Sequence, residues 1–262
     1  MNGAAQRFSE LVGLPDADVP LDEAALLVAA HAYPDLDVPA ELARLDLLAS
    51  TCAVPTLDGL CRHLFDELGF SGNTRRYGDP RNSFLNEVVS RRVGIPISLS
   101  VLTIEVGRRV GVPLVGVGLP GHFLVRSADD PSALLDPFNA GRRLGLEDCA
   151  ELFRAVHGAG APFDPDLLAP VGPRAILVRM LANLRQVYGA TGDARGLGEV
   201  LRLRVAIPAS SVPDRADLAR ALASLGRYPE AATILDELSE ALPAPASGRA
   251  RNEALALRAR LN

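Results

Sequence analysis

One stretch of the sequence decides the fold: residues 94–102, GIPISLSVL, begin a segment with almost no polar face before Arg108. Apolar residues occupy every side of the predicted helix, and a helix that is apolar all round is buried. The helix is predicted to end at Gly111, with Pro113 just beyond it. We therefore expect a buried helix at the centre of a domain.

The hydrophobic period changes after this helix. PLVGVGLP (113–120) and GHFLVRS (121–127) are short segments rich in β-branched or aromatic residues, and they meet at Pro120-Gly121. This pattern predicts a hairpin, and ALLDPFNAGRRL (133–144) predicts a further strand and turn. Helices precede the strands instead of alternating with them, so the predicted fold class is α+β.

Helices are also predicted before the buried helix. The N-terminal candidates are LDEAALLVAAHAY (21–33), PAELARLDLLASTCAV (39–54) and TLDGLCRHLFDELGF (56–70). The last should begin with Thr56 as its N-cap and stop near Gly69. NSFLNEVVSRRV (82–93) fits a helix capped by Asn82 or Ser83.

An internal repeat marks the C-terminal part, which is helical from about residue 146. Gly192 aligns with Gly226 at a separation of 34 residues, and Leu184 aligns with Leu218 at the same offset. Thirty-four residues is the period of the tetratricopeptide helix pair. We expect helix pairs at about 173–206 and 212–242 and a final helix from Asn252, packed on the preceding domain. The alternative is an ordinary helical tail with a chance match.

Composition argues against several classes of protein. The net charge is −5 and no basic run exceeds a pair, whereas a non-specific nucleic-acid binder needs a basic footprint. No apolar run approaches the length of a membrane span, and the N-terminus lacks a signal-peptide pattern. We expect a cytoplasmic protein.

Neither a metal nor a cofactor is expected. The four histidines are scattered, and no glycine-rich phosphate loop is present. Cys52, Cys61 and Cys149 lack metal-type spacing and are interpreted as reduced, buried structural residues.

Ser98 and Ser100, His122 and Asp136 follow one another in the order in which one class of thiol enzymes places its nucleophile, base and orienting acid. A helix N-terminus favours a nucleophile because its free N–H groups stabilise negative charge. His122 would be the base and Asp136 would orient it. Serine at a helix start is, however, most often a cap.

Residues 82–144, from NSFLNEVVSRRV to LLDPFNAGRRL, strongly resemble the SirB family of bacterial transglutaminase-like proteins. The resemblance covers roughly residues 40–150 and extends into the helical tail. It implies a papain-like transglutaminase core, a central buried helix against an antiparallel sheet, followed by tetratricopeptide-type helices. The expected parts are N-terminal helices (1–80), the core (81–160) and the repeats (161–262).

By this resemblance His122 and Asp136 match the family's histidine and aspartate. The cysteine position falls at about Pro96 to Ser98, and no cysteine is there. The first hypothesis is therefore an inactive transglutaminase-like domain that binds a peptide or protein. The second is an amide or ester hydrolase or acyltransferase that uses Ser98 or Ser100, or water activated by His122.

Several polar residues are candidates for supporting roles. Asn82 is expected to cap or brace the loop before the central helix, and Asn139 to line the same cleft as His122. Glu105 interrupts the apolar helix, so a partner is expected among the arginines Arg91, Arg92 and Arg109. The arginine pairs at 91–92, 108–109 and 142–143 are interpreted as solvated surface, although a cluster that includes Arg92 would receive an acidic peptide or carboxylate.

Overall fold

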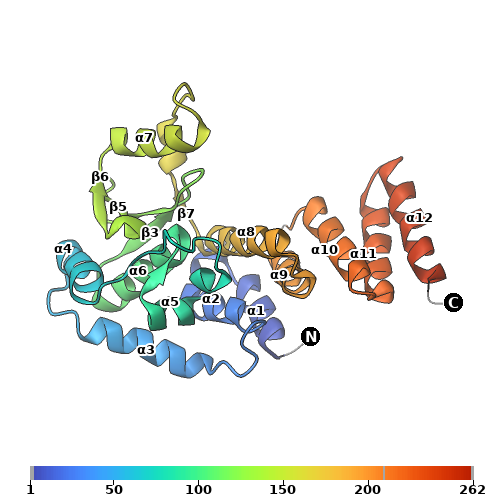
Figure 1. The fold of residues 1–262 in the computed structure, drawn as a ribbon, viewed down its shortest axis with the longest axis horizontal. Coiled ribbons are helices and arrows are strands. Elements are labelled where there is room, and N and C mark those ends of the chain that lie inside the picture. The colour runs from blue at the N-terminus through green and yellow to red at the C-terminus, as the bar shows by residue number, and fades with distance from the viewer. Residues whose placement is uncertain (1–2, 209, 261–262) are drawn as a thin grey trace. The chain divides into compact units, whose positions relative to one another are not determined.

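The computed structural model describes residues 3–208 and 210–260 (Figure 1). Leu14–Met180 form one compact unit, and the residues up to Gly13 form a second unit with those from Leu181 onward. The predicted division into three parts, with boundaries at residues 80 and 160, is based on sequence patterns, whereas these two units are defined by compactness. The three-part division therefore stays a prediction.

A five-stranded antiparallel sheet lies in the first unit, with the strand order β6-β5-β4-β3-β7. The β3–β4 pair forms the predicted hairpin, with Leu114 opposite Ser127 and Val117 opposite Leu124. The strands are β3 (Leu114–Val117), β4 (Leu124–Ser127), β5 (Leu134–Asp136), β6 (Arg142–Leu144) and β7 (Pro170–Val171).

The buried helix is α6 (Pro96–Val110), and it packs against β3 and β4 (Figure 1). Every residue from Pro96 to Gly107 is buried, which confirms the prediction from its apolar pattern. Proline fits the first helical turn because the N–H it lacks would have no intrahelical partner. Gly111 ends the helix with φ of +77°, a conformation that glycine adopts without strain.

Further helices surround α6 in this unit. Thr56 is the predicted cap of α4, and its side chain accepts a hydrogen bond from the Gly59 N–H. The two-residue strands β1 (Ser71–Gly72) and β2 (Val93–Gly94) pair in parallel. The helices are α2 (Leu21–Ala29), α3 (Val38–Ser50), α4 (Leu57–Cys61) with a π-helical turn (Arg62–Glu67), α5 (Leu85–Arg91) and α7 (Leu146–His157).

The predicted cap of α5 is wrong. Asn82 and Ser83 lie in a separate 3₁₀ turn, Pro80–Ser83, and Phe84 occupies the N-cap position without a side-chain bond. Asp79 caps the 3₁₀ turn instead, through the Arg81 N–H. Asn82 is not available as a cap because its amide group bonds the preceding loop, as described below.

The second unit consists of helices: α1 (Gly3–Gly13), the C-terminal part of α8 (Pro173–Thr191), α9 (Ala194–Ala206), α10 (Val212–Ser224), α11 (Tyr228–Ala241) and α12 (Ala246–Ala259). The two predicted helix pairs are present, and Gly192 and Gly226 separate their members with φ of +71° and +74°. The final helix begins at Ala246, earlier than predicted. The hydrophobic core of the second unit includes Leu201 and Leu235, which occupy equivalent positions 34 residues apart in the two helix pairs. Their tetratricopeptide character stays a prediction.

Across the described residues, no helix combines the length and apolar composition that crossing a bilayer requires. The three cysteines are free thiols. Cys149 is buried as expected, but Cys52 and Cys61 are only partly buried, because each lies near the end of a helix rather than on its fully covered face.

Candidate functional site

His122 and Asp136 meet at neighbouring strands of the sheet. His122 lies two residues before β4, and Asp136 is the last residue of β5. His122 Nε2 is 2.9 Å from Asp136 Oδ2, although the ring N–H does not point straight along that line. Asp136 is only 1% exposed, whereas the His122 side chain is 13% exposed. We refer to this pair as the dyad.

Asp136 is held by the residues that follow it. Its Oδ1 accepts hydrogen bonds from the backbone N–H groups of Phe138 (3.1 Å) and Asn139 (3.3 Å). Its Oδ2 accepts one from Asn139 Nδ2 at 2.7 Å. Burial alone would raise the pKa of Asp136, but the contact and charge of His122 together with the Asn139 bonds lower it overall. Asp136 is therefore ionised at neutral pH and can stabilise a protonated imidazole.

The second ring nitrogen of His122 has a different environment. Among the described residues, Nδ1 has no hydrogen-bond partner, and it is not enclosed by protein. The backbone positions the ring through a tight turn, in which the His122 N–H donates to the Leu119 carbonyl at 2.9 Å. Nδ1 can therefore exchange a proton with a bound molecule or with water.

Ser98 braces the start of α6. It is fully buried, and its Oγ donates to the Asn82 carbonyl at 2.5 Å and accepts from the Ile95 N–H at 3.1 Å. Asn82 is also fully buried, and its Nδ2 donates to the carbonyls of Arg76 and Tyr77. Together these bonds tie the loop before α5 to the helix start.

Ser100 and its neighbours present no nucleophile to solvent. Ser100 is 0% exposed, and among the described residues its Oγ has no hydrogen-bond partner. Pro96 and Ile97, at the position where the resemblance places the cysteine, are buried as well. No side chain from residue 96 to 100 therefore offers an exposed hydroxyl or thiol.

Phe138 joins the dyad to the start of α6. A Cβ placed on Gly72 would lie 2.6 Å from the Phe138 ring, so the ring rests directly on the Gly72 backbone. Gly72 in turn pairs with Gly94, which lies two residues before α6. The Phe138 ring also stands edge-on to the His122 ring, with centroids 6.1 Å apart.

Tyr77 and Arg179 complete the surroundings of the dyad. Tyr77 is 50% exposed and stands edge-on to Phe138 at 6.1 Å. Burial raises the pKa of Tyr77, and the positive charge of Arg179 opposes that rise. Arg179 Nη2 donates to the carbonyls of Leu119 and His122 at 3.3 and 3.4 Å. We call Tyr77, Phe138 and Arg179 the rim.

Other predicted residues lie apart from the dyad. Arg92 is exposed and ends α5 in a left-handed conformation, and its carbonyl accepts from the Ser71 N–H. Arg142 and Arg143 pair with Asp148 and Asp58. Arg142 lies opposite Asp136 in the β5–β6 pair, but among the described residues none of these arginines forms an ion pair with Asp136.

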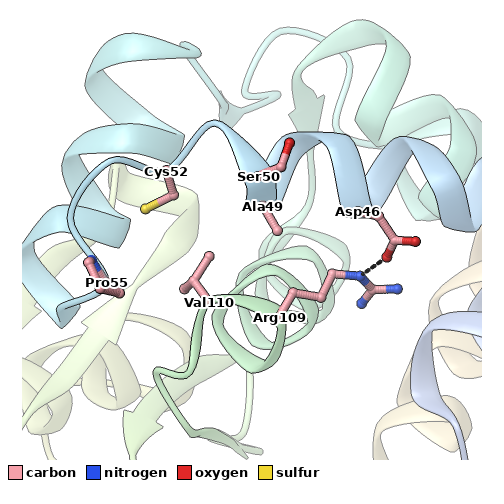
Figure 2. A pocket seen from close by; sticks show the side chains of 7 residues that line it. All are labelled: Asp46, Ala49, Ser50, Cys52, Pro55, Arg109 and Val110. Atoms are coloured by element: carbon pink, nitrogen blue, oxygen red, sulfur yellow. Dashed lines mark hydrogen bonds and ion pairs between the residues drawn. The ribbon is translucent and has the colours of Figure 1, made fainter.

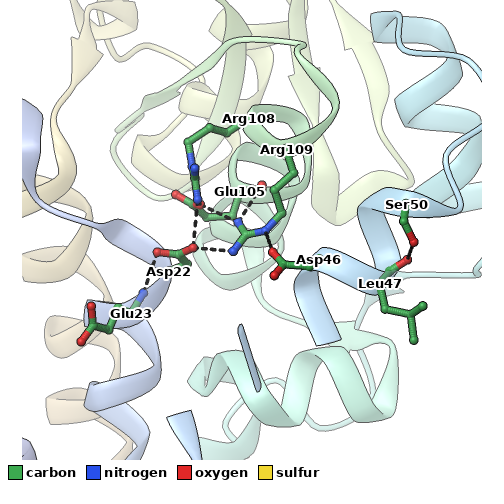
Figure 3. A network of polar contacts seen from close by, with 8 residues as sticks. All are labelled: Asp22, Glu23, Asp46, Leu47, Ser50, Glu105, Arg108 and Arg109. Carbon is green, nitrogen blue, oxygen red and sulfur yellow. Dashed lines mark hydrogen bonds and ion pairs between the residues drawn. The ribbon is translucent and has the colours of Figure 1, made fainter. Parts of the chain in front are cut away.

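A buried ionic network surrounds Glu105 (Figure 3). Glu105 is 3% exposed, and its Oε2 contacts Arg108 at 2.9 Å and Arg109 at 3.0 Å. Both arginines also contact Asp22 Oδ2, at 3.0 and 2.6 Å, and Arg109 contacts Asp46 at 2.7 Å. Arg109 is thus one of the predicted partners. The interpretation of residues 108–109 as solvated surface is wrong for Arg109, which is only 11% exposed, because two buried carboxylates require it there.

An open pocket of about 400 Å³ lies at the C-terminal end of α6. Figure 2 shows Cys52 and Pro55 on one side of it and the Asp46–Arg109 pair on the other. No dyad or rim residue lines it. Within the described ranges, no group of histidine, cysteine or carboxylate side chains has the arrangement of a metal site.

Comparisons with known proteins show which family the sequence resembles. Residues 30–182 match the family model of the transglutaminase-like superfamily. A UPF0162 protein of Xylella fastidiosa is 44% identical over 70% of each chain, and one of Pseudomonas aeruginosa is 36% identical over 66% of each. F-box only protein 21 of Mus musculus is 31% identical over 66% of this chain and 29% of its own length. No solved structure matches significantly.

Proposed function

Because the chain belongs to the transglutaminase-like superfamily, we propose that it uses this fold without a nucleophilic cysteine, to bind a peptide segment of another protein at the dyad and rim. The proposal covers the function of the first unit. About two thirds of the chain is similar to part of a longer F-box only protein, of which the match covers 29%, and this supports use of the fold as a module within larger chains.

The burial of the start of α6 carries this proposal. Acyl transfer by a protein nucleophile begins when its oxygen or sulfur, within about 3 Å of a base, attacks an accessible carbonyl. The two hydroxyls available, on Ser98 and Ser100, are both fully buried. Ser98 is also engaged with two backbone groups.

The rim supports recognition instead. Tyr77 is exposed beside the Phe138 ring, and a rigid aromatic side chain with a polar tip is a common anchor in protein interfaces. Tyr77 is itself held by the Asn82 amide through its backbone carbonyl, so it is presented without a large ordering cost on binding.

Peptide selection tests the proposal. Random peptides displayed on phage are selected on the wild-type protein, and their affinities are measured for the Tyr77→Ala, His122→Ala and Leu47→Ala variants. Leu47 is the matched control, because it is 65% exposed on α3 and belongs to neither dyad nor rim. We expect Tyr77→Ala to weaken binding about tenfold or more and Leu47→Ala to change it less than about twofold. Equal affinities for all variants, or no enriched peptide, would refute the proposal.

A second function is favoured by one observation, the unpartnered Nδ1 of His122. In this alternative Nδ1 takes a proton from a water molecule, whose oxygen attacks the carbonyl carbon of an amide or ester. The imidazolium, stabilised by Asp136, then gives the proton to the leaving amine or alcohol as the bond to carbon breaks.

Hydrolysis assays separate the two functions. Activated esters and fluorogenic amides are incubated with the wild type, His122→Ala, and the double variant Ser98→Ala/Ser100→Ala. Binding alone predicts no turnover that depends on His122. Turnover lost in His122→Ala but kept in the double variant selects activated water, and turnover lost in both selects a serine.

A further inference from the structure

We propose that Arg179 binds a carboxylate of the recognised ligand, with the Tyr77 hydroxyl as a second donor. This inference rests on the proposed function, since it assigns the chemistry of the ligand at the same rim. It concerns an arginine that no sequence motif marked as functional.

Only one of the three guanidinium nitrogens of Arg179 makes hydrogen bonds within the part of the chain that the structure describes. Its Nη2 is used by two backbone carbonyls at 3.3 and 3.4 Å, which fix the plane of the guanidinium. Among the described residues, no carboxylate lies within ion-pair distance of Arg179, and its Nε and Nη1 have no hydrogen-bond partner. These two nitrogens are open to solvent. In the described part of the chain, the arginine nitrogens that are both buried and unpartnered are Arg91 Nη1 and Arg126 Nε.

Arg179 lacks the carboxylate contact that half-buried arginines such as Arg109 and Arg204 make. Within the described ranges, Arg126 and Arg215 are likewise half-buried without an ion pair, so it is the position beside His122 that distinguishes Arg179. Arg179 is half-buried on α8, where it has lost part of its hydration without gaining a counter-charge. A ligand carboxylate would supply that charge and accept an N–H bond from Nε or from Nη1, which lie on different sides of the guanidinium.

The position of Arg179 places this carboxylate beside the dyad. Arg179 donates to the His122 backbone carbonyl, the His122 ring stands edge-on to the Phe138 ring, and the Phe138 ring stands edge-on to Tyr77. These contacts place Arg179 and Tyr77 at the two ends of one series that includes the dyad histidine. The Tyr77 hydroxyl has no partner among the described residues, so it can donate to the same group.

One cation and one neutral hydroxyl match a single negative charge. A doubly charged phosphate is usually met by more than one cation. Of the three rim residues only Arg179 is charged, and the ionised Asp136 of the neighbouring dyad also disfavours a second negative charge. The carboxylate has two sources in a peptide, its C-terminus or an aspartate or glutamate side chain. Both present the same planar group to the guanidinium.

Nuclear magnetic resonance of the full chain tests the inference. Four N-acetylated alanine peptides are titrated: one with a free C-terminus, one amidated, and two amidated peptides that contain one glutamate or one glutamine. The Arg179 Nε–H signal is followed, and sodium acetate is compared with sodium chloride at equal ionic strength. We expect each carboxylate peptide to bind about tenfold tighter than its neutral counterpart, and acetate but not chloride to shift the Arg179 signal saturably.

Variants identify the group responsible. Arg179→Gln should abolish the preference for carboxylate, while Arg92→Gln, which removes an exposed arginine away from the dyad, should retain it. Unchanged backbone signals outside the 119–122 turn, whose carbonyls Arg179 contacts directly, establish that Arg179→Gln is folded. Equal affinities for acid and amide peptides, or a preference that survives Arg179→Gln, would overturn the inference while leaving peptide binding intact. An acetate response without binding of any displayed or synthetic peptide would instead overturn the proposed function and leave the carboxylate site standing.

Discussion

Replacing Arg109 by methionine should strongly destabilise the first unit. Arg109 contacts Asp22, Glu105 and Asp46, and the first two carboxylates are only 7% and 4% exposed. The Asp46 contact contributes little, because that carboxylate is 69% exposed. Loss of the buried contacts leaves two like charges together with one exposed cation. Removing one partner from a buried ionic network costs about 3–5 kcal/mol.

Arg108→Met is the matched control. Arg108 contacts the same two carboxylates at 3.0 and 2.9 Å, but its side chain is 60% exposed. Water can replace much of its contribution, so the expected loss is about 1 kcal/mol or less. Hydrogen exchange of the α6 amides across a urea series reports the free energy of unfolding of this unit. A loss below about 1 kcal/mol for Arg109→Met, or equal losses for both variants, would refute this reasoning.

The pH dependence provides a second check on the same variant. In the wild type, burial raises the pKa of Asp22 but the contacts with Arg109 and Arg108 lower it overall, so this carboxylate favours the folded state above its unfolded pKa and loses that effect as pH falls. In Arg109→Met, burial dominates and the folded state takes up a proton. Stability of the variant should therefore fall as pH rises, and the gap to wild type should be wider at pH 7 than at about pH 5. A gap that widens on acidification contradicts this account.

Three further predictions concern single side chains. Ser98→Ala should cost about 1–3 kcal/mol of unfolding free energy, because it leaves buried backbone groups unpaired. Ser100→Ala should be neutral or stabilise by about 1 kcal/mol, because it removes an unpartnered hydroxyl. Similar losses for both variants in urea unfolding would contradict this contrast. Gly72→Ala should cost about 1–3 kcal/mol because its Cβ would lie 2.6 Å from a phenyl ring, while Gly78→Ala meets no atom within 4 Å and should match wild type in thermal unfolding. Burial raises the Cys61 pKa to about 11, so its alkylation at pH 8.5 should be at least about tenfold slower in the native protein than in urea, and equal rates would count against that value.

The sequence predicted the central elements of the fold because their patterns are local. The apolar residues of α6 identify a buried helix without any knowledge of its neighbours. The change of period after Gly111, with Pro120-Gly121 between two apolar segments, predicted the β3–β4 hairpin. The order of His122 and Asp136 also predicted that they would approach each other across neighbouring strands.

The remaining features depend on contacts between distant segments. Asn82 has the residue type of a helix cap, and its use as a loop brace depends on Arg76, Tyr77 and Ser98 at their folded positions. Arg179 is 57 residues from His122 in the chain, so no spacing rule could join them. A signal did exist for Tyr77, which is the one aromatic residue in the polar loop SGNTRRYGDPRN.

Asp136 has a structural role that is separate from its contact with His122. One carboxylate oxygen closes the turn after β5, and through that turn it sets the path of the chain into Phe138 and β6. Replacing this aspartate should therefore lower stability whether or not the protein catalyses a reaction. Folding alone gives a reason for an aspartate at this position, beside the histidine. The presence of this acid–histidine pair consequently does not by itself indicate catalysis.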